Sequence, residues 1–282
     1  MNMTVHDDGG RARPARIPRL ATPEGLACRL RARGHRWGFV LDHDGTLARF
    51  RRDPAEALPS ARALRAVRRL LQSGFPVCVL SGRLLSFLHR AYPVAGLELA
   101  GCHGAEWPGG PRVERTPACR AARRLERRVR RALQGAPSPL LVESKPFGVA
   151  VHVRGLLPTQ RWYWQPAARA ALAAAAPRSF AIGEGSQVVE ARPRRTDKGR
   201  AFRRLVRRSS SWRRPLVAVG DDRTDEDLFA ALGPCDVGVL VARAPRPSAA
   251  RWRLRGPRDV LRFLERMAGR LGGRGVGTIR PV

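Results

Sequence analysis

The sequence is short of lysine: among its 54 Lys+Arg residues, only Lys145 and Lys198 are lysines. It also lacks a cysteine pattern, since the five cysteines are odd in number and form no CxxC pair, which argues against a disulfide framework and a zinc site. No apolar run approaches the ~20 residues that span a bilayer, and the N-terminus has no apolar stretch of the secretory type. We therefore expect a cytoplasmic protein without a membrane partner.

Acidic residues are few relative to basic ones: 54 Lys+Arg oppose 23 Asp+Glu, which leaves a net charge of +31. Clustered arginines attract polyanions by counterion release. Here the arginines are spread through several segments rather than gathered on one arm, which is typical of solvated helix faces and a coding bias toward arginine. We do not expect nucleic acid as a partner, and a polyanion-binding protein stays open as an alternative.

Three short apolar runs, WGFVL, FPVCVL and PLVAV, are continuous rather than alternating, as are the strands of a buried parallel sheet. Helical patterns lie beside them, at 59–74 after the first run and at 198–208 before the third. Strands that alternate with helices predict crossover units. The fold class predicted is α/β, with a doubly wound, mostly parallel sheet.

The middle of the chain has another order of elements, namely helix, strand, strand, helix, strand, strand. We therefore predict an α+β cap domain at 108–191, inserted into a catalytic core formed by 36–107 and 192–268. Segment 1–35 is basic and rich in arginine and proline, and its beginning is expected to be a disordered tail. Segment 269–282 is expected to be a flexible C-terminal tail.

Each apolar run is followed by a polar cluster: DHDGT, SGR and GDDRTDED. The carboxyl ends of parallel strands meet at one edge of a sheet, where ligands bind. Asp42 and Asp44 should therefore lie near Asp221 and Asp222. Carboxylates so close repel one another unless a cation or a shared proton separates them, and Mg²⁺ prefers such oxygen ligands. The sequence predicts a magnesium site made by these four aspartates.

An aspartate can also attack a phosphoryl group and form an aspartyl-phosphate, while a second aspartate protonates the leaving alcohol and later deprotonates water. The charge on the phosphoryl group must be balanced by cations and hydrogen-bond donors. Lys198, Ser81 and the backbone around Gly82 and Thr46 can supply them. The residues alone therefore predict metal-dependent hydrolysis of a phosphomonoester at a capped site.

The ordered motifs DHDGTL, LSGR, TDKG and GDDRTDED resemble those of the haloacid dehalogenase (HAD) superfamily. Within it, VESKPFGVAVHVR and GSQVVEARPRRTDKGRAF are similar to the trehalose-phosphate phosphatase family, over about residues 36–232. The resemblance implies a Rossmannoid core with a cap. It also implies a Mg²⁺-dependent phosphatase that converts trehalose 6-phosphate to trehalose and phosphate, with a separate trehalose-phosphate synthase chain in the pathway.

Carried over by position, the resemblance makes Asp42 the nucleophile and a metal ligand. Asp44 would be the general acid/base and would ligate the metal through its carbonyl group. Asp221 would be the third protein ligand, and Asp222 would support the metal shell. The metal set expected from the resemblance is therefore the same four aspartates.

Ser81 and Lys198 match the positions that bind the phosphoryl group. A compact ammonium fits where a planar guanidinium does not, which explains why lysine persists in so arginine-rich a chain. We also expect Asp225 to begin a helix and to contact Lys198. The remaining matched positions are expected to bind substrate: Arg83, His103, Glu143, Lys145 and Glu190.

His43 departs from the family, which usually has an apolar or aromatic residue between the two aspartates. Strand alternation predicts that its side chain points away from the carboxylates. We therefore interpret His43 as a tolerated change in packing and not as a catalytic group. Two alternatives to the main hypothesis remain. A phosphatase for another sugar phosphate would differ at the cap residues, and a polyanion-binding protein on a HAD scaffold would not need all four of Asp42, Asp44, Lys198 and Asp221.

Overall fold

The computed structural model describes residues 15–51, 53–110, 116–185 and 187–269. The tails predicted for the first residues of the chain and for 269–282 therefore lie almost wholly outside the described residues. Within the described part, no helix is both long enough and apolar enough to cross a membrane.

The core is a seven-stranded sheet in the order β1-β11-β10-β9-β2-β3-β4. Every pairing in it is parallel, which confirms the predicted sheet type. The three predicted apolar runs form β9, β2 and β3, which are adjacent in the sheet. The strands are β1 (Arg19–Leu20), β2 (Gly38–Leu41), β3 (Val77–Leu80), β4 (Glu98–Ala100), β9 (Leu216–Gly220), β10 (Val237–Val241) and β11 (Trp252–Leu254).

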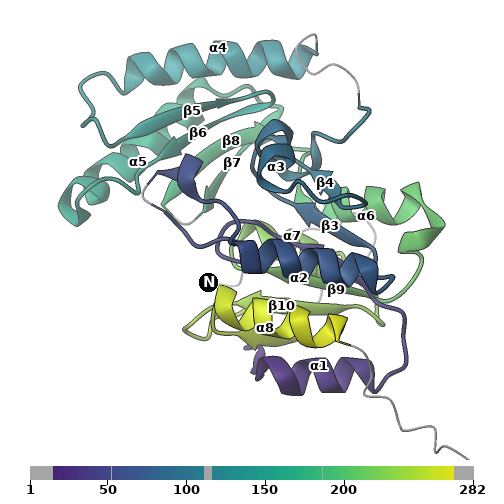
Figure 1. Ribbon diagram of the computed structural model, residues 1–282. Coiled ribbons are helices and arrows are strands. Elements are labelled where there is room, and N and C mark those ends of the chain that lie inside the picture. Colours follow the sequence, from purple (N-terminus) through teal and green to yellow (C-terminus); the bar gives the residue numbers. More distant parts are fainter. Residues whose placement is uncertain (1–14, 52, 111–115, 186, 270–282) are drawn as a thin grey trace, which may run out of the picture.

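Helices cover both faces of this sheet (Figure 1), as a doubly wound fold requires. Phe39 and Leu41 pack with α1, α2, α3 and α8, whereas Val40 between them packs with α6 and α7. The Ser60 side chain caps the start of α2. The helices are α1 (Pro23–Arg31), α2 (Ala61–Gln72), α3 (Leu85–Ala91), α6 (Lys198–Arg208), α7 (Thr224–Ala230) and α8 (Pro257–Ala268).

The core also contains β1 and α1, which the sequence analysis had assigned to the basic N-terminal segment 1–35. Helix α1 packs on α8 and buries Leu26, Ala27 and Leu30. Arg29 is exposed and Arg31 is half-buried. The arginine-rich composition of this segment obscured a short amphipathic helix.

A second unit lies above the core in Figure 1, with α4 on its outer side. It is a four-stranded antiparallel sheet in the order β5-β6-β8-β7, and α4 and α5 pack on one face of it. Its elements follow the predicted order of helices and strands. They are α4 (Pro117–Ala132), β5 (Leu141–Lys145), β6 (Gly148–His152), α5 (Pro158–Ala175), β7 (Phe180–Gly185) and β8 (Val188–Pro193).

Candidate active site

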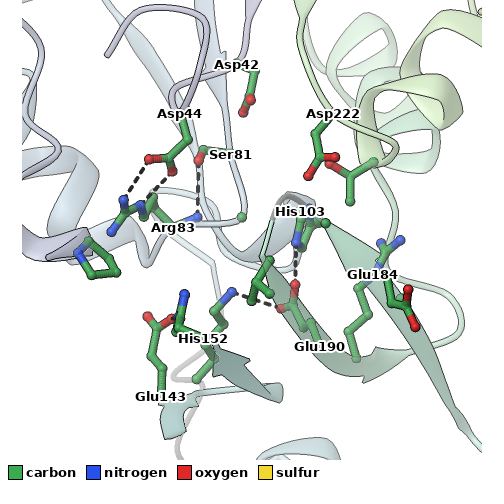
Figure 2. Close-up of a pocket in the computed structure, with 18 of the residues that line it drawn as sticks. Asp42, Asp44, Ser81, Arg83, His103, Glu143, His152, Glu184, Glu190 and Asp222 are labelled. Carbon is green, nitrogen blue, oxygen red and sulfur yellow. Dashed lines mark hydrogen bonds and ion pairs between the residues drawn. The ribbon is translucent and has the colours of Figure 1, made fainter. Parts of the chain in front are cut away.

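The carboxyl ends of β2, β3 and β9 meet at one pocket, which the four-stranded sheet closes from the other side. Asp42 follows β2 and donates its backbone N–H to Val219 of β9 at 2.9 Å. Figure 2 shows Asp42 and Asp44 across the pocket from Glu143 and Glu190. All the residues predicted for the site line this pocket, namely Asp42, Asp44, Ser81, Arg83, His103, Glu143, Lys145, Glu190, Lys198, Asp221 and Asp222.

Three carboxylates form the acidic centre of the pocket. Asp42, Asp221 and Asp225 each offer an oxygen within 4.8 Å of the others. Burial raises the pKa of Asp42 to about 7 against the opposing charge of Lys198, and burial also raises the pKa of Asp221 well above its usual value. Asp221 Oδ1 is buried and has no hydrogen-bond partner among the described residues. These features fit a divalent cation, which would stabilise the charged carboxylates.

The members of this cluster have different tasks. Asp225 Oδ1 lies 2.7 Å from Lys198 Nζ, and its Oδ2 accepts the backbone N–H groups of Asp221 and Asp222 at 3.1 and 3.0 Å. Both carboxylate oxygens of Asp225 therefore already have partners, and Asp225 positions the other members of the cluster. Asp42 and Asp221 are left to face a cation.

The predicted metal set overlaps this cluster only in part. The carboxylate of Asp44 lies instead against Arg83, and Asp222 Oδ1 accepts the backbone N–H of Arg223 at 2.7 Å. The cluster of three carboxylates includes neither of them. Contact of Asp44 and Asp222 with a metal stays a prediction.

Lys198 lies between Asp42 and Asp225, and its contact with Asp225 was expected from the sequence. Its Nζ is 2.7 Å from oxygens of both Asp42 and Asp225, and the residue is 1% exposed. Burial opposes its charge, but the two carboxylates outweigh this and raise the pKa of Lys198 above its usual value. The lysine begins α6, where Asp197 caps the helix. A charged ammonium is thus fixed beside the predicted nucleophile.

Arg83 and Asp44 form a bidentate ion pair, with both N···O distances at 2.7 Å. Burial works to raise the pKa of Asp44, but the Arg83 guanidinium outweighs it and the pKa is lowered. Arg83 also stacks on the Phe87 ring at 4.8 Å, and its backbone N–H donates to Ser81 Oγ at 3.2 Å. Asp44 is therefore held as a carboxylate.

The cap side of the pocket follows from strand alternation. Val142, Val151 and Val189 pack inward against α4 and α5, so their neighbours Glu143, His152 and Glu190 face the pocket. The sequence predicts the same alternation for His152, but as the polar face of a strand and not as a site residue, whereas the structure places it in the pocket. Its Nε2 lies 2.7 Å from Glu143 Oε2.

Glu190 joins the cap to the core. Its Oε1 accepts from Lys145 Nζ at 3.0 Å, and its Oε2 lies 2.9 Å from His103 Nε2 (Figure 2). Burial would raise the pKa of Glu190, but Lys145 and His103 lower it well below its usual value. Burial lowers the pKa of His103 to about 4, so this ring is neutral near pH 7. A neutral His103 donates its Nε2 proton to the carboxylate.

The backbone around His103 is unusual. Cys102 and His103 both have positive φ, at 48° and 54°, and a β-carbon at Gly82 would collide with the His103 ring. Non-glycine residues in this conformation cost about 1–3 kcal/mol each and cluster at functional sites. The conformation had no signal in the sequence beyond the Gly-Cys-His-Gly run.

A parallel sheet that presents a DxD loop, a serine, a lysine and a second acidic loop to a capped pocket defines the haloacid dehalogenase class of hydrolases. The chain belongs to the trehalose-phosphatase family, whose model matches residues 40–258.

Curated relatives agree with that family. The trehalose-phosphate phosphatase of Mycobacterium marinum is 33% identical over 270 residues, covering 92% of this chain and 66% of that protein. That of Mycolicibacterium paratuberculosis is 37% identical over 253 residues, covering 84% and 63%. The chain thus spans about two thirds of the length of these relatives.

Among solved structures, the C-terminal domain of a C. albicans trehalose-6-phosphate phosphatase superposes with a TM-score of 0.77 at 22% identity, covering 90% of this chain and 98% of that one. A trehalose-6-phosphate phosphatase related protein gives a TM-score of 0.62 at 22% identity, covering 82% and 96%. At these identities the likeness shows the fold.

Proposed function

We propose that this protein is a Mg²⁺-dependent phosphatase that hydrolyses trehalose 6-phosphate to trehalose and inorganic phosphate. The observation that carries the proposal is the buried contact of Asp42 with Lys198, set beside Asp221 in a pocket that also holds Glu143 and Glu190. Membership in the trehalose-phosphatase family and the names of the relatives support the choice of sugar.

Asp42 and Asp221 would hold the Mg²⁺, as the unpartnered Asp221 Oδ1 supports. When bound, the ion would neutralise these carboxylates and offset the negative charge of the phosphoryl group. Lys198 would donate to a phosphoryl oxygen, and its charge opposes the rise that burial causes in the pKa of Asp42. Ser81 offers a further hydroxyl donor at the same edge.

In the first step, an Asp42 carboxylate oxygen would form a bond to phosphorus as the bond from phosphorus to the sugar oxygen breaks. Asp44 would protonate the departing oxygen, for which its pair with Arg83 must open and its carboxylate must first take up a proton from solvent. In the second step, water would attack the aspartyl-phosphate, Asp44 would accept the water's proton, and the phosphorus bond to Asp42 would break.

The cap residues would bind the sugar. Glu143, Lys145 and Glu190 are held by one another or by neighbouring histidines, so their oxygens and nitrogen are oriented before a ligand arrives. Hydroxyl groups suit such charged partners. We propose that the cap selects the sugar and excludes water during phosphoryl transfer.

The cellular setting completes the proposal. All five cysteines are free thiols, which suits the reducing cytoplasm. The substrate would come from a separate trehalose-phosphate synthase.

The experiment is phosphate release from a panel of sugar phosphates, with Mg²⁺ and with EDTA. We expect trehalose 6-phosphate to be hydrolysed, EDTA to abolish the reaction, and Asp42→Asn to lower kcat by about 10³-fold or more. A matched control is Asp236→Asn, because this aspartate lies outside the pocket and bonds the backbone of Leu216 and Gly233. Undiminished activity in Asp42→Asn would remove the nucleophile assignment. Hydrolysis of another sugar phosphate alone would replace the substrate.

A further inference from the structure

The His43 side chain is fully buried and forms two hydrogen bonds outside the pocket. Its Nε2 lies 2.7 Å from the carbonyl oxygen of Ala57, and its Nδ1 lies 2.7 Å from the Tyr92 hydroxyl. A carbonyl oxygen only accepts, so Nε2 carries the proton and Nδ1 accepts from Tyr92. An apolar residue at this position could make neither bond.

The carbonyl group that His43 binds belongs to one wall of the substrate pocket. Ala57 is buried and directly follows η1 (Pro54–Glu56), and its backbone N–H donates to Pro54 at 3.2 Å. Pro54 and Phe50 both line the pocket. We call Phe50, Arg51 and residues 53–57 the pocket wall. His43 therefore fastens this wall to the loop that carries Asp42 and Asp44.

Arg154, which follows β6 of the cap, holds the same wall from the opposite side. Its guanidinium lies 4.4 Å from the centre of the Phe50 ring, and its Nη1 donates to the Arg51 carbonyl at 3.2 Å. Arg154 also lines the pocket. The wall is thus fixed to the nucleophile loop at one end and to the cap at the other.

We propose that His43 and Arg154 are positioning residues for the sugar phosphate, which act through the pocket wall. The wall supplies the apolar surfaces of Phe50 and Pro54 beside the cap's charged residues, and the two anchors fix its distance from Asp42. This inference rests on the proposed function for its substrate. It assigns to His43 a role in binding rather than in filling space.

The kinetic consequence is a change in KM more than in kcat. The wall faces the substrate, but it does not include the nucleophile, the acid/base or the phosphoryl-binding residues. Releasing it would weaken binding in the ground state and the transition state alike. We expect KM for trehalose 6-phosphate to rise by about tenfold in His43→Leu and in Arg154→Ala, with kcat within about threefold.

The two substitutions should also be non-additive. If both residues act through one wall, removal of the second anchor should add little to the KM increase, because loss of the first anchor has already released the wall. We expect KM in the double variant to rise far less than the product of the two single effects. Independent effects that multiply would contradict a shared wall.

Two control variants separate this role from general destabilisation. Tyr92→Phe removes the other partner of His43 and leaves the bond to Ala57 possible, so it should lower stability without raising KM. Arg131→Lys changes an exposed arginine near the end of α4 and should change neither the stability nor KM. Equal KM increases in Tyr92→Phe and His43→Leu would overturn the role of the Ala57 bond.

A second measurement is independent of the substrate. Hydrogen exchange without ligand should be faster at the amides of Ala55, Glu56 and Ala57 in His43→Leu than in the unchanged protein and in Tyr92→Phe. If the unchanged protein does not hydrolyse trehalose 6-phosphate, the proposed function fails, and exchange still decides whether His43 fixes the wall. Unchanged exchange and unchanged KM in both anchor variants would overturn the inference.

Discussion

Lys198 places one ammonium group between two buried carboxylates, 2.7 Å from each. Removing the cation would leave Asp42 and Asp225 buried without it, a change that typically costs about 3–5 kcal/mol. We predict that Lys198→Met lowers the free energy of unfolding by about that amount and abolishes phosphate release. Chemical denaturation in the presence of EDTA measures the first effect, and phosphate release with Mg²⁺ the second.

A Lys198→Arg variant separates charge from shape. The guanidinium keeps a positive charge but cannot occupy the space of a compact ammonium that is 1% exposed. We expect it to be inactive and also destabilised. A Lys198→Met protein as stable as the unchanged one would contradict this account of the site.

His103 should make stability depend on pH. Its pKa is about 4 in the folded protein, because of burial, against an ordinary value of about 6.5. Between these values the unfolded chain binds more protons than the folded one, so the stability from neutral His103 is complete above about pH 6.5 and is lost as pH falls toward 4. We predict a decrease of at most about 1.4 kcal/mol per pH unit in this window.

The measurement is thermal or chemical unfolding from about pH 7 to about pH 5, compared with His103→Asn. The difference between the two proteins isolates His103 from the other titrating groups, including Glu190, whose lowered pKa acts at more acidic pH. Parallel curves for the two proteins would show that His103 does not contribute.

Single residues differ in how far the sequence could predict them. Asp42, Ser81, Lys198 and Asp221 were predictable because each follows an apolar strand or begins a helix with a recognisable motif. The partners of His43 were not, since Ala57 and Tyr92 are brought to it by a turn and a helix whose packing no local pattern encodes. The Arg83 pair with Asp44 was hidden for the same reason.

At the scale of elements, the central strands were predictable and the edges were not. Strands β2, β3 and β9 are fully buried and therefore read as continuous apolar runs. Strands β1, β4 and β11 have only two or three residues, which is too short for a periodic pattern. Helix α1 was missed because it has only nine residues, and its few apolar positions lie among arginines in a segment rich in arginine and proline.

The turn after β2 fixes the distance between two acidic loops. Gly45 has φ +70°, and a β-carbon there would collide with the Asp221 carboxylate. We predict that Gly45→Ala lowers the free energy of unfolding by about 1–2 kcal/mol from backbone strain and displaces Asp221. Mg²⁺ affinity measured by calorimetry should therefore fall together with activity.

Gly74 offers a matched control for that substitution. It has a similar φ of +79°, but a β-carbon there would meet open space. Gly74→Ala should therefore show a comparable loss of stability and normal Mg²⁺ binding and activity. If the two alanine variants behaved alike in both assays, the collision with Asp221 would have no functional role.

At the scale of the whole molecule, the net charge of +31 surrounds a pocket whose centre is acidic. Arginines occupy the exposed faces of α4 and α6, while the apolar faces of these helices pack on the two sheets. This distribution agrees with solvated helix faces, and a positive surface would also attract a phosphorylated sugar from a distance. The charge itself says nothing of the fold.

The two lysines have a consequence for the chemistry of the surface. The Lys198 side chain is 2% exposed and that of Lys145 is 9% exposed, and the chain has no other lysine. The exterior consequently offers no side-chain primary amine, so amine-directed labels, cross-linkers and aldehyde fixatives should find only the terminal amino group. An enzyme that acetylates a lysine or attaches ubiquitin to it would have to reach into the pocket itself.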